Sequence, residues 1–499
     1  MSKRTLILLG FIILKFLLQH FLISPEYDLQ RDEYLHLDQG HHLAWGYESV
    51  PPFTSWISWI IFQLGNSVFW VKFFPSLFGA LTILVVWKTI EVLNGNLFAL
   101  IMGATAATFS VLLRINILYQ PNSFDILSWT LFYYTFICYI KTEKIKWLYF
   151  AAIVFAIGFL NKYNIAFLLI GLVPAILLTE QRKLLLNKHV YFAMIVSLLL
   201  ISPNLIWQYQ NNFAVLRHMK ELAETQLVNV QRSDFLKEQL LFFFNSIFVL
   251  VIALIGFFIY PPFKKYRLFF WSLIFTLIVF TYFKAKGYYA IGLYPILLAF
   301  GAVYLEYLTS NGWKKWFRPI CILVSLLIFL PAIKKIFPVE SPEEIVKDSK
   351  GKTHRWEDGK EHILQQDFAD MLGWRELAAR TDSIYKTLPD KEHTIVLCAN
   401  YGEAGAINFY TKEKIQAVSI NADYINWFHL DKKILSAILV KDDSKENVDH
   451  EKTLFESVIL RGTIENEFAR EKGTRIFLLS GPKTDINKVI EEEINKKNR

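Results

Sequence analysis

The feature that most constrains the fold is a series of long apolar segments separated by short polar ones. Crossing the hydrocarbon core of a bilayer takes about 20 apolar residues in a helix. Only 20% of the residues are charged and mean hydropathy is +0.31, which leaves too little polar surface for a soluble chain of 499 residues. The sequence therefore predicts a polytopic α-helical membrane protein. About eleven segments qualify as spans, near residues 5–23, 68–90, 97–114, 122–140, 146–160, 163–178, 189–208, 239–260, 267–284, 288–308 and 318–336.

Lysine and arginine predict how these spans are oriented. With Ser2–Arg4 on the cytoplasmic side, eleven alternating spans place every compact basic loop there too, namely "KTEKIK", "EQRKLLLNK", "FKKYR" and "WKKWFR". This pattern accounts for the net charge of +8 without a nucleic-acid partner. The N-terminal segment has no small-residue cleavage site, so we expect an uncleaved first span. The loops rich in Asp, Tyr, Trp and Asn then lie on the extracytoplasmic face of the plasma membrane.

From about residue 338 the composition becomes charged and typical of a soluble domain. Five short strand-like runs, "TIVLCA", "IQAVSI", "ILSAILV", "SVILRG" and "RIFLLSG", alternate with polar stretches. We therefore expect a transmembrane domain over residues 1–337 and an extracytoplasmic α/β domain over residues 338–499. The sequence has no P-loop, no G-x-G-x-x-G opening a helix, no C-x-x-C and no H-E-x-x-H. It thus assigns no residues to a metal or a nucleotide, although a divalent cation remains compatible with it.

Residues 209–238 form the longest polar stretch between two apolar segments. Phe213, Leu216, Met219 and Leu222 recur at helical spacing, with charged residues between them. The pattern predicts an amphipathic helix, which lies either on the membrane surface or over the neighbouring loops.

The first outward loop concentrates titratable residues. Asp32 and Glu33 follow the first span by about nine residues, which places them at the membrane–water boundary. A carboxylate beside an apolar wall is poorly solvated and makes a good base, whereas in an ordinary polar loop it would simply be hydrated. Both interpretations are open on the sequence alone.

Three histidines in the same loop raise the question of a metal site. His36, His41 and His42, with Asp38 between them, carry suitable ligand atoms. Their spacing does not place three ligands on one helical face, which favours ordinary interfacial histidines over metal ligands.

Two further places hold ionisable groups at span ends. Asp125 follows Pro121 at the start of the fourth span, where either the helix dipole or a function in a cavity would explain an acid. Lys284, Lys286, Tyr288 and Tyr289 lie at the outer end between the ninth and tenth spans. A lysine at that depth can bind a lipid phosphate, or can snorkel to headgroups in general.

Several motifs, taken in order, resemble a known family. They are Asp-Glu-x-Tyr and "LAWGYESVPPF" after the first span, "YQPNSFD", "SPNLIWQYQNNF" and "KAKGYYAIGLYP", with "ANYGEAGAINFY" in the tail. Together they resemble bacterial members of glycosyltransferase family 39, relatives of protein O-mannosyltransferases and of lipid A aminoarabinose transferases. The resemblance covers residues 1 to about 310 and is extended by the tail motif.

The resemblance implies a C-type glycosyltransferase fold and a sugar donor carried on a polyprenyl phosphate. It implies that Asp32, the first acid of the pair, is the catalytic base, that Asp125 shares its cavity, and that Lys286 with the neighbouring tyrosines binds the carrier phosphate. Relatives that modify lipid A carry a lysine before the proline of the first loop, where this chain reads "YESVPPF". That departure speaks against a lipid A acceptor.

Residues and resemblance together predict an inverting glycosyltransferase in the plasma membrane. The acceptor would be a hydroxyl of a lipid, a glycan or a protein. One alternative is a lipid or solute transporter, which would show repeated halves and polar groups at the midplane. Another is a protein-binding tail on an inactive membrane scaffold. The clustering of polar groups at span ends on one face favours the transferase.

Overall fold

The computed structural model describes residues 1–225, 227, 230–442 and 448–497. The chain divides into two compact units. The helical unit comprises Met1–Leu22, Ala44–Thr54 and Phe69–Phe337. The sheet unit comprises Ile23–Leu43, Ser55–Val68 and Pro338–Arg499. The polar loop after the first apolar segment therefore divides between the units, and its titratable residues 31–42 belong to the sheet unit.

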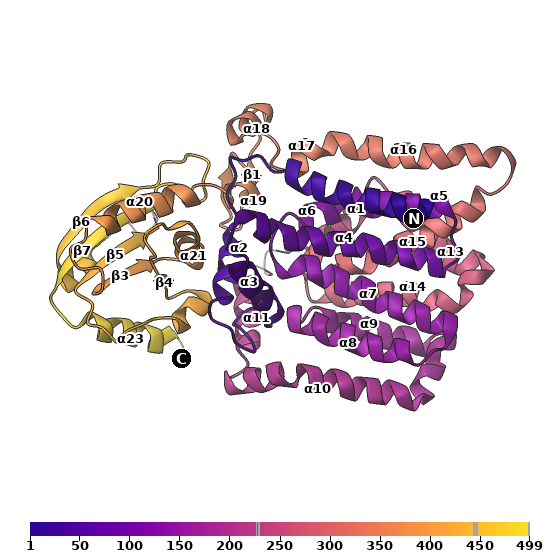
Figure 1. Cartoon of the computed structure of the whole chain (residues 1–499), viewed down its shortest axis with the longest axis horizontal. Helices are drawn as coiled ribbons and strands as arrows, with labels where there is room; N and C mark the ends of the chain where they lie inside the picture. The colour runs from indigo at the N-terminus through magenta and orange to yellow at the C-terminus, as the bar shows by residue number, and fades with distance from the viewer. Residues whose placement is uncertain (226, 228–229, 443–447, 498–499) are drawn as a thin grey trace. The chain divides into compact units, whose positions relative to one another are not determined.

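The helical unit consists of helices that run side by side, as the indigo to pink ribbons of Figure 1 show. Its α-helices are α1 (Lys3–Phe21), α4 (Val68–Val92), α5 (Leu97–Thr108), α6 (Val111–Ile115), α7 (Pro121–Thr142), α8 (Lys146–Asn161), α9 (Ile165–Leu177), α10 (Lys188–Gln210), α11 (Ala214–Thr225), α12 (Arg232–Leu241), α13 (Ile247–Ile259), α14 (Arg267–Tyr282), α15 (Tyr294–Leu308), α16 (Phe317–Phe329) and α17 (Ile333–Ile336). Short 3₁₀ turns connect or extend them: η1 (Glu180–Leu186), η3 (Pro261–Tyr266), η4 (Gly287–Leu293), η5 (Gly312–Trp316) and η6 (Leu330–Ala332).

Each of the eleven apolar segments expected from the sequence contains helix. Within the described residues, five helices are long and apolar enough to cross a membrane by themselves: Lys3–Phe21, Val68–Val92, Lys188–Gln210, Gly287–Leu308 and Gly312–Ile336. Two bent pairs raise that number to seven when each pair is taken as one span, with bends of 108° and 100°. The segment expected over 97–114 is divided, because the helix ends at Thr108 and a short one follows. A polytopic helical architecture is confirmed.

Buried aromatic and aliphatic side chains form the core of the helical unit, centred on α5, α7, α13, α14 and α15. Trp129 and Tyr133 of α7 are buried in it. The hydroxyls of Tyr133 and Ser272 lie 2.7 Å apart and join α7 to α14. These two buried hydroxyls thus satisfy each other inside the bundle, as a water-poor interior favours.

The stretch 209–238 forms two helices, α11 and α12. Leu216 and Met219 are exposed along α11, and Phe213 is exposed directly before it, as expected of an amphipathic helix. Residues 226, 228 and 229, between the two helices, lie outside the described residues.

The sheet unit is a three-layer α/β arrangement (Figure 1). Its sheet has the strand order β4-β3-β5-β7-β6, with β4, β3 and β5 parallel and β7 antiparallel to both of its neighbours. The strands are β3 (Thr394–Cys398), β4 (Ala417–Ser419), β5 (Ser436–Lys441), β6 (Phe455–Thr463) and β7 (Arg475–Pro482). All five coincide with the runs expected from the sequence. A separate hairpin pairs β1 (His354–Arg355) with β2 (Glu361–His362).

Helices cover both faces of this sheet. The unit's α-helices are α2 (Arg31–Gln39), most of α3 (Phe53–Gln63), α18 (Pro342–Asp348), α19 (Gln366–Ala369), α20 (Trp374–Lys386), α21 (Tyr401–Tyr410), α22 (Asp449–Leu454) and α23 (Ile486–Lys497), with the 3₁₀ turn η7 (Ala422–Asn426). On one face Ile486 and Ile490 of α23 pack with Phe477 and Leu479. Helices α20 and α21 contact the sheet and each other.

Candidate active site

Asp32 and Glu33 lie in the first turn of α2 but have different environments. Gln30 and Glu33 form a capping box: the Gln30 side chain accepts from the Asp32 amide at 2.9 Å, and Glu33 Oε2 accepts from the Gln30 amide at 2.6 Å. Glu33 is fully buried. Asp32 is only half-buried. Of the two acids that the sequence proposes, Asp32 is the one with a partly accessible carboxylate.

The carboxylate of Asp32 accepts a short hydrogen bond from the tail of the chain. The Tyr401 hydroxyl donates to Asp32 Oδ1 at 2.6 Å. The Arg31 guanidinium stacks on the same ring, with its carbon 4.4 Å from the ring centroid, and its Nε lies 4.0 Å from Glu471. Sequence reasoning did not assign Tyr401, although it lies within the quoted "ANYGEAGAINFY" motif.

The histidines and Asp38 have partners within the sheet unit. His42 stacks on Trp427 with 4.3 Å between centroids, and His41 packs edge-on against Phe62. Asp38 Oδ2 accepts from Tyr424 at 2.6 Å and from Asn408 at 2.7 Å. These rings and the carboxylate pack in separate places, which favours the interpretation of ordinary structural residues over a metal site.

Asp125 lies in the helical unit at the beginning of α7. Pro121 is the first helical residue, so Asp125 lies one turn further into the helix than expected. The helix dipole acts mainly within the first turn. The Asp125 carboxylate is buried and accepts from the Trp129 indole at 3.0 Å and from Asn164 Nδ2 at 2.9 Å. Asn164 Nδ2 also donates to the carbonyl of Tyr289 at 2.9 Å. Asn164 thus joins Asp125 to the tyrosine segment.

The tetrapeptide "NKYN" between α8 and α9 contacts both the beginning of α7 and the tyrosines Tyr288 and Tyr289. Asn161 donates to the carbonyl of Pro121 at 2.9 Å. Lys162 Nζ donates to Asn122 Oδ1 at 2.7 Å. The same ammonium group lies 4.4 Å from the ring centroid of Tyr289 and 5.1 Å from that of Tyr288.

The third residue of that tetrapeptide reaches a different helix. The Tyr163 hydroxyl donates to Asn204 Oδ1 at 3.2 Å and accepts from Gln208 Nε2 at 2.7 Å. Asn204 Nδ2 in turn donates to the carbonyl of Trp45 at 2.7 Å. Segments that are far apart in sequence, among them "LAWGY", "YQPNSFD", "NKYN" and "SPNLIWQYQ", therefore meet in one part of the helical unit. Sequence reasoning had not assigned Asn161 or Asn164, although two amides beside a lysine between short apolar segments were a usable signal.

The two lysines of the "KAKGYY" segment differ in position. Lys286 is half-buried directly before η4, and its charge acts on both Lys162 and His218. Lys284 has a left-handed backbone with φ of 53°. Within the described part of the chain, no hydrogen bond or ion pair joins Lys284 to Asp125, Lys162 or the tyrosines. We call Asp125, Lys162, Asn164, Lys286, Tyr288 and Tyr289 the cation–tyrosine cluster.

One group of side chains in the helical unit could hold a metal ion. Glu48, His218 and Glu221 each offer one ligand atom, and these atoms lie within 4.8 Å of one another. Burial lowers the pKa of His218, and the two glutamates partly offset that effect. A neutral imidazole with two carboxylates is a ligand set suited to Zn²⁺ or Mn²⁺. The sequence assigned none of these residues, because Glu48 lies about 170 positions before His218 and Glu221.

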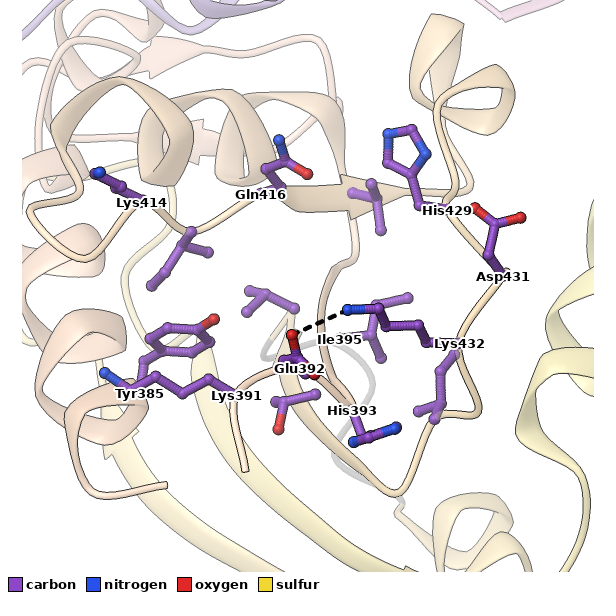
Figure 2. A pocket seen from close by; sticks show the side chains of 15 residues that line it. Tyr385, Lys391, Glu392, His393, Ile395, Lys414, Gln416, His429, Asp431 and Lys432 are labelled. Atoms are coloured by element: carbon purple, nitrogen blue, oxygen red, sulfur yellow. Dashed lines mark ion pairs between the residues drawn. The ribbon is translucent and has the colours of Figure 1, made fainter. Parts of the chain in front are cut away.

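The sheet unit contains a separate pocket of about 300 Å³, shown in Figure 2. It lies at the amino-terminal ends of β3, β4 and β5, whereas Tyr401 follows the carboxyl end of β3. Lys432 and Glu392 pair across it at 3.1 Å, and Lys391 pairs with Glu413 at 3.3 Å. The pocket is therefore not at the end of the sheet that contacts Asp32.

Comparison with known proteins agrees with this architecture. Residues 49–207 match the family model described as dolichyl-phosphate-mannose-protein mannosyltransferase. The structure of ArnT from Cupriavidus metallidurans bound to undecaprenyl phosphate superimposes with a TM-score of 0.64 at 13% identity, covering 96% of this chain and 98% of that one. The apo form gives a TM-score of 0.61 at 12% identity with the same coverage. The chain has the C-type glycosyltransferase fold.

One curated relative is also similar in sequence. It is the lipid A galacturonosyltransferase RgtD of Rhizobium johnstonii, 25% identical over 230 residues. The aligned region is 45% of this chain, and the chain spans about half the length of that relative, 47%. The fold expected from the sequence is confirmed, and the site residues stay predictions.

Proposed function

We propose that this protein is an inverting glycosyltransferase that takes its sugar from a polyprenyl-phosphate carrier. The observation that carries the proposal is the cation–tyrosine cluster, in which a buried carboxylate, two lysines and two tyrosines gather at one end of the helices of a membrane protein. Ammonium groups at headgroup depth bind lipid phosphates. The fold shared with an ArnT structure that holds undecaprenyl phosphate supports the same donor class.

The chemistry assigns separate roles to the carboxylate and the cations. Asp32 removes the proton from the acceptor hydroxyl, and the oxygen forms a bond to the anomeric carbon of the sugar. The bond from that carbon to the carrier phosphate breaks, and its electron pair leaves with the phosphate. Lys286 and Lys162 stabilise the charge on the departing phosphate. A single displacement of this kind inverts the anomeric centre.

Among the three acceptor classes, a lipid is favoured by the similarity to RgtD, which is named for its action on lipid A. The segment "YESVPPF" lacks the lysine that lipid A-modifying relatives carry before the proline, which argues for an acceptor other than lipid A itself. We therefore propose a lipid hydroxyl, with glycan and protein hydroxyls as the alternatives to be tested beside it.

A divalent cation is compatible with the Glu48, His218 and Glu221 group. These residues would hold the cation. The bound cation would add positive charge near Lys286, which already acts electrostatically on His218. Its contribution would be electrostatic attraction of a phosphate.

We propose the plasma membrane of a bacterium as the location, with residues 338–499 on the extracytoplasmic face. The test is a pair of reporter fusions active only outside the cytoplasm. A fusion after residue 345 should be active and one near Lys144 should be silent. The reverse pattern would contradict the orientation.

The function is tested with the purified full-length protein in nanodiscs. The donors are undecaprenyl phosphates that carry labelled galacturonic acid, mannose or 4-amino-4-deoxyarabinose, and the acceptor pool is a cell-envelope extract. We expect label to move to one acceptor fraction as free undecaprenyl phosphate is released. A transporter would instead move labelled lipid or solute across proteoliposomes without cleaving the donor, and that result would overturn the proposal.

A further inference from the structure

The hydrogen bond between Tyr401 and Asp32 joins positions 369 residues apart within the sheet unit. At 2.6 Å it is short, as expected for a neutral hydroxyl that donates to a carboxylate. Burial raises the pKa of Tyr401 well above its ordinary value, and the nearby charge of Asp32 adds to that effect. The phenol therefore stays protonated and remains the donor.

The amino terminus of α21 holds the tyrosine in place. Tyr401 is the first residue of the helix, directly after Asn400. Asn400 accepts from the Glu403 amide at 3.1 Å, and Glu403 Oε2 accepts from the amides of Asn400 and Ala399 at 3.2 and 2.9 Å. This capping box fixes the backbone on both sides of Tyr401.

Two glycines bring α21 close to α2. A Cβ on Gly402 would lie 2.6 Å from Arg31 Cγ, and one on Gly405 would lie 2.6 Å from Tyr34 Cβ. Any larger residue would push the helices apart, so these positions need glycine for close packing rather than for backbone freedom. Arg31 can then cover the face of the Tyr401 ring while the hydroxyl reaches Asp32. Most residues of "ANYGEAG" thus contribute to this one contact between α21 and α2.

We infer that Tyr401 is the positioning residue for the proposed base, Asp32. The phenol holds one carboxylate oxygen and restricts the rotation of the side chain, so that the base is presented to the acceptor hydroxyl in one orientation. Loss of such positioning lowers the rate rather than donor affinity, because the donor phosphate is bound by other groups. The inference rests on the proposed function.

The test is Tyr401→Phe, which removes only the hydroxyl and keeps the ring beneath Arg31. A matched control is Tyr424→Phe, since Tyr424 also donates at 2.6 Å to a carboxylate of α2, that of Asp38. We expect kcat to fall about 10- to 100-fold in the first variant with the donor KM within about 2-fold of wild type. The control should keep kcat within about 3-fold.

A second measurement separates positioning from folding. In an Asp32→Asn background the hydroxyl has no base to position, so adding Tyr401→Phe should change the residual rate by less than about 2-fold. The inference would be overturned if kcat fell equally in Tyr401→Phe and Tyr424→Phe, or if Tyr401→Phe lowered the residual rate as much in the Asp32→Asn background as in wild type. Neither result would contradict the proposed transferase activity. A wild-type protein that transfers no sugar would instead overturn the proposed function, and the inference with it.

Discussion

Replacement of Asp32 by asparagine tests the proposed base with little change in local structure. The asparagine oxygen can accept a hydrogen bond from the Tyr401 hydroxyl, as the carboxylate does. The backbone amide of residue 32 still donates to the Gln30 side chain within the cap of α2. The change exchanges a charge-assisted hydrogen bond for a neutral one, which costs about 1 kcal/mol of folding stability. The protein should therefore reach its normal abundance in the membrane.

The effect on transfer should be much larger than the effect on folding. An amide cannot take a proton from the acceptor hydroxyl, and loss of a general base lowers a rate by about 10²- to 10⁴-fold. That factor corresponds to about 3–5 kcal/mol of transition-state stabilisation. Donor binding should be largely kept, because the cation–tyrosine cluster is unchanged.

The assay measures initial rates of label transfer from the accepted donor, with donor binding followed separately by ligand-induced stabilisation. Asp38→Asn is the matched control, since it makes the same substitution on α2 and its carboxylate also accepts a phenol at 2.6 Å. Glu33→Gln should be milder than Asp32→Asn, because Glu33 serves the helix cap. Equal transfer rates for Asp32→Asn and wild type would refute the assignment of the base.

Three further predictions concern the phosphate, the metal and the pH dependence of stability. Lys286→Ala should impair use of the polyprenyl donor more than Lys286→Arg does, and Lys162→Ala should cause a comparable loss, both measured as kcat/KM for the donor; unchanged donor use in both alanine variants would contradict the cluster's role. Glu48→Ala should lower the zinc or manganese bound per protein in elemental analysis, and equal metal content would show that this group is not a site. Burial raises the pKa of Asp38 from 3.8 to about 7, and hydrogen bonds from Tyr424 and Asn408 partly oppose it. The folded state then binds this proton more tightly than the unfolded state, so the Asp38 contribution to stability falls as pH rises from about 4 through 7. The melting temperature should therefore drop more between pH 5 and pH 8 in wild type than in Asp38→Asn, and equal drops would exclude that titration.

Much of the fold was predictable because its causes are local in sequence. Long apolar runs must form helices in a bilayer, since no other structure in a single segment satisfies the backbone. Short alternating runs after residue 394 became strands with nearly the expected bounds. The bent helices were harder, because an apolar run has the same composition whether it continues straight or turns by about 100°, as at residues 247–282.

The candidate site was predictable only in part. Asp32, Asp125 and the tyrosines of "KAKGYY" were found as ionisable or amphipathic groups at span ends. Asn164 was not selected, because its role depends on Asp125 and the Tyr289 carbonyl, which meet it only in the fold.

The sequence by itself determined the class of protein, the positions of most elements and the abundance of titratable groups in the loop after the first apolar segment. Only the tertiary structure decided what distinguishes those groups. Asp32 and Glu33 are adjacent and chemically alike. Glu33 completes the cap of α2, whereas Asp32 accepts a hydrogen bond from the Tyr401 hydroxyl. That difference depends on packing between α2 and α21, which two glycines make close enough for a 2.6 Å hydrogen bond. Contacts between residues so far apart in sequence leave no periodic pattern, and a single sequence therefore cannot reveal them.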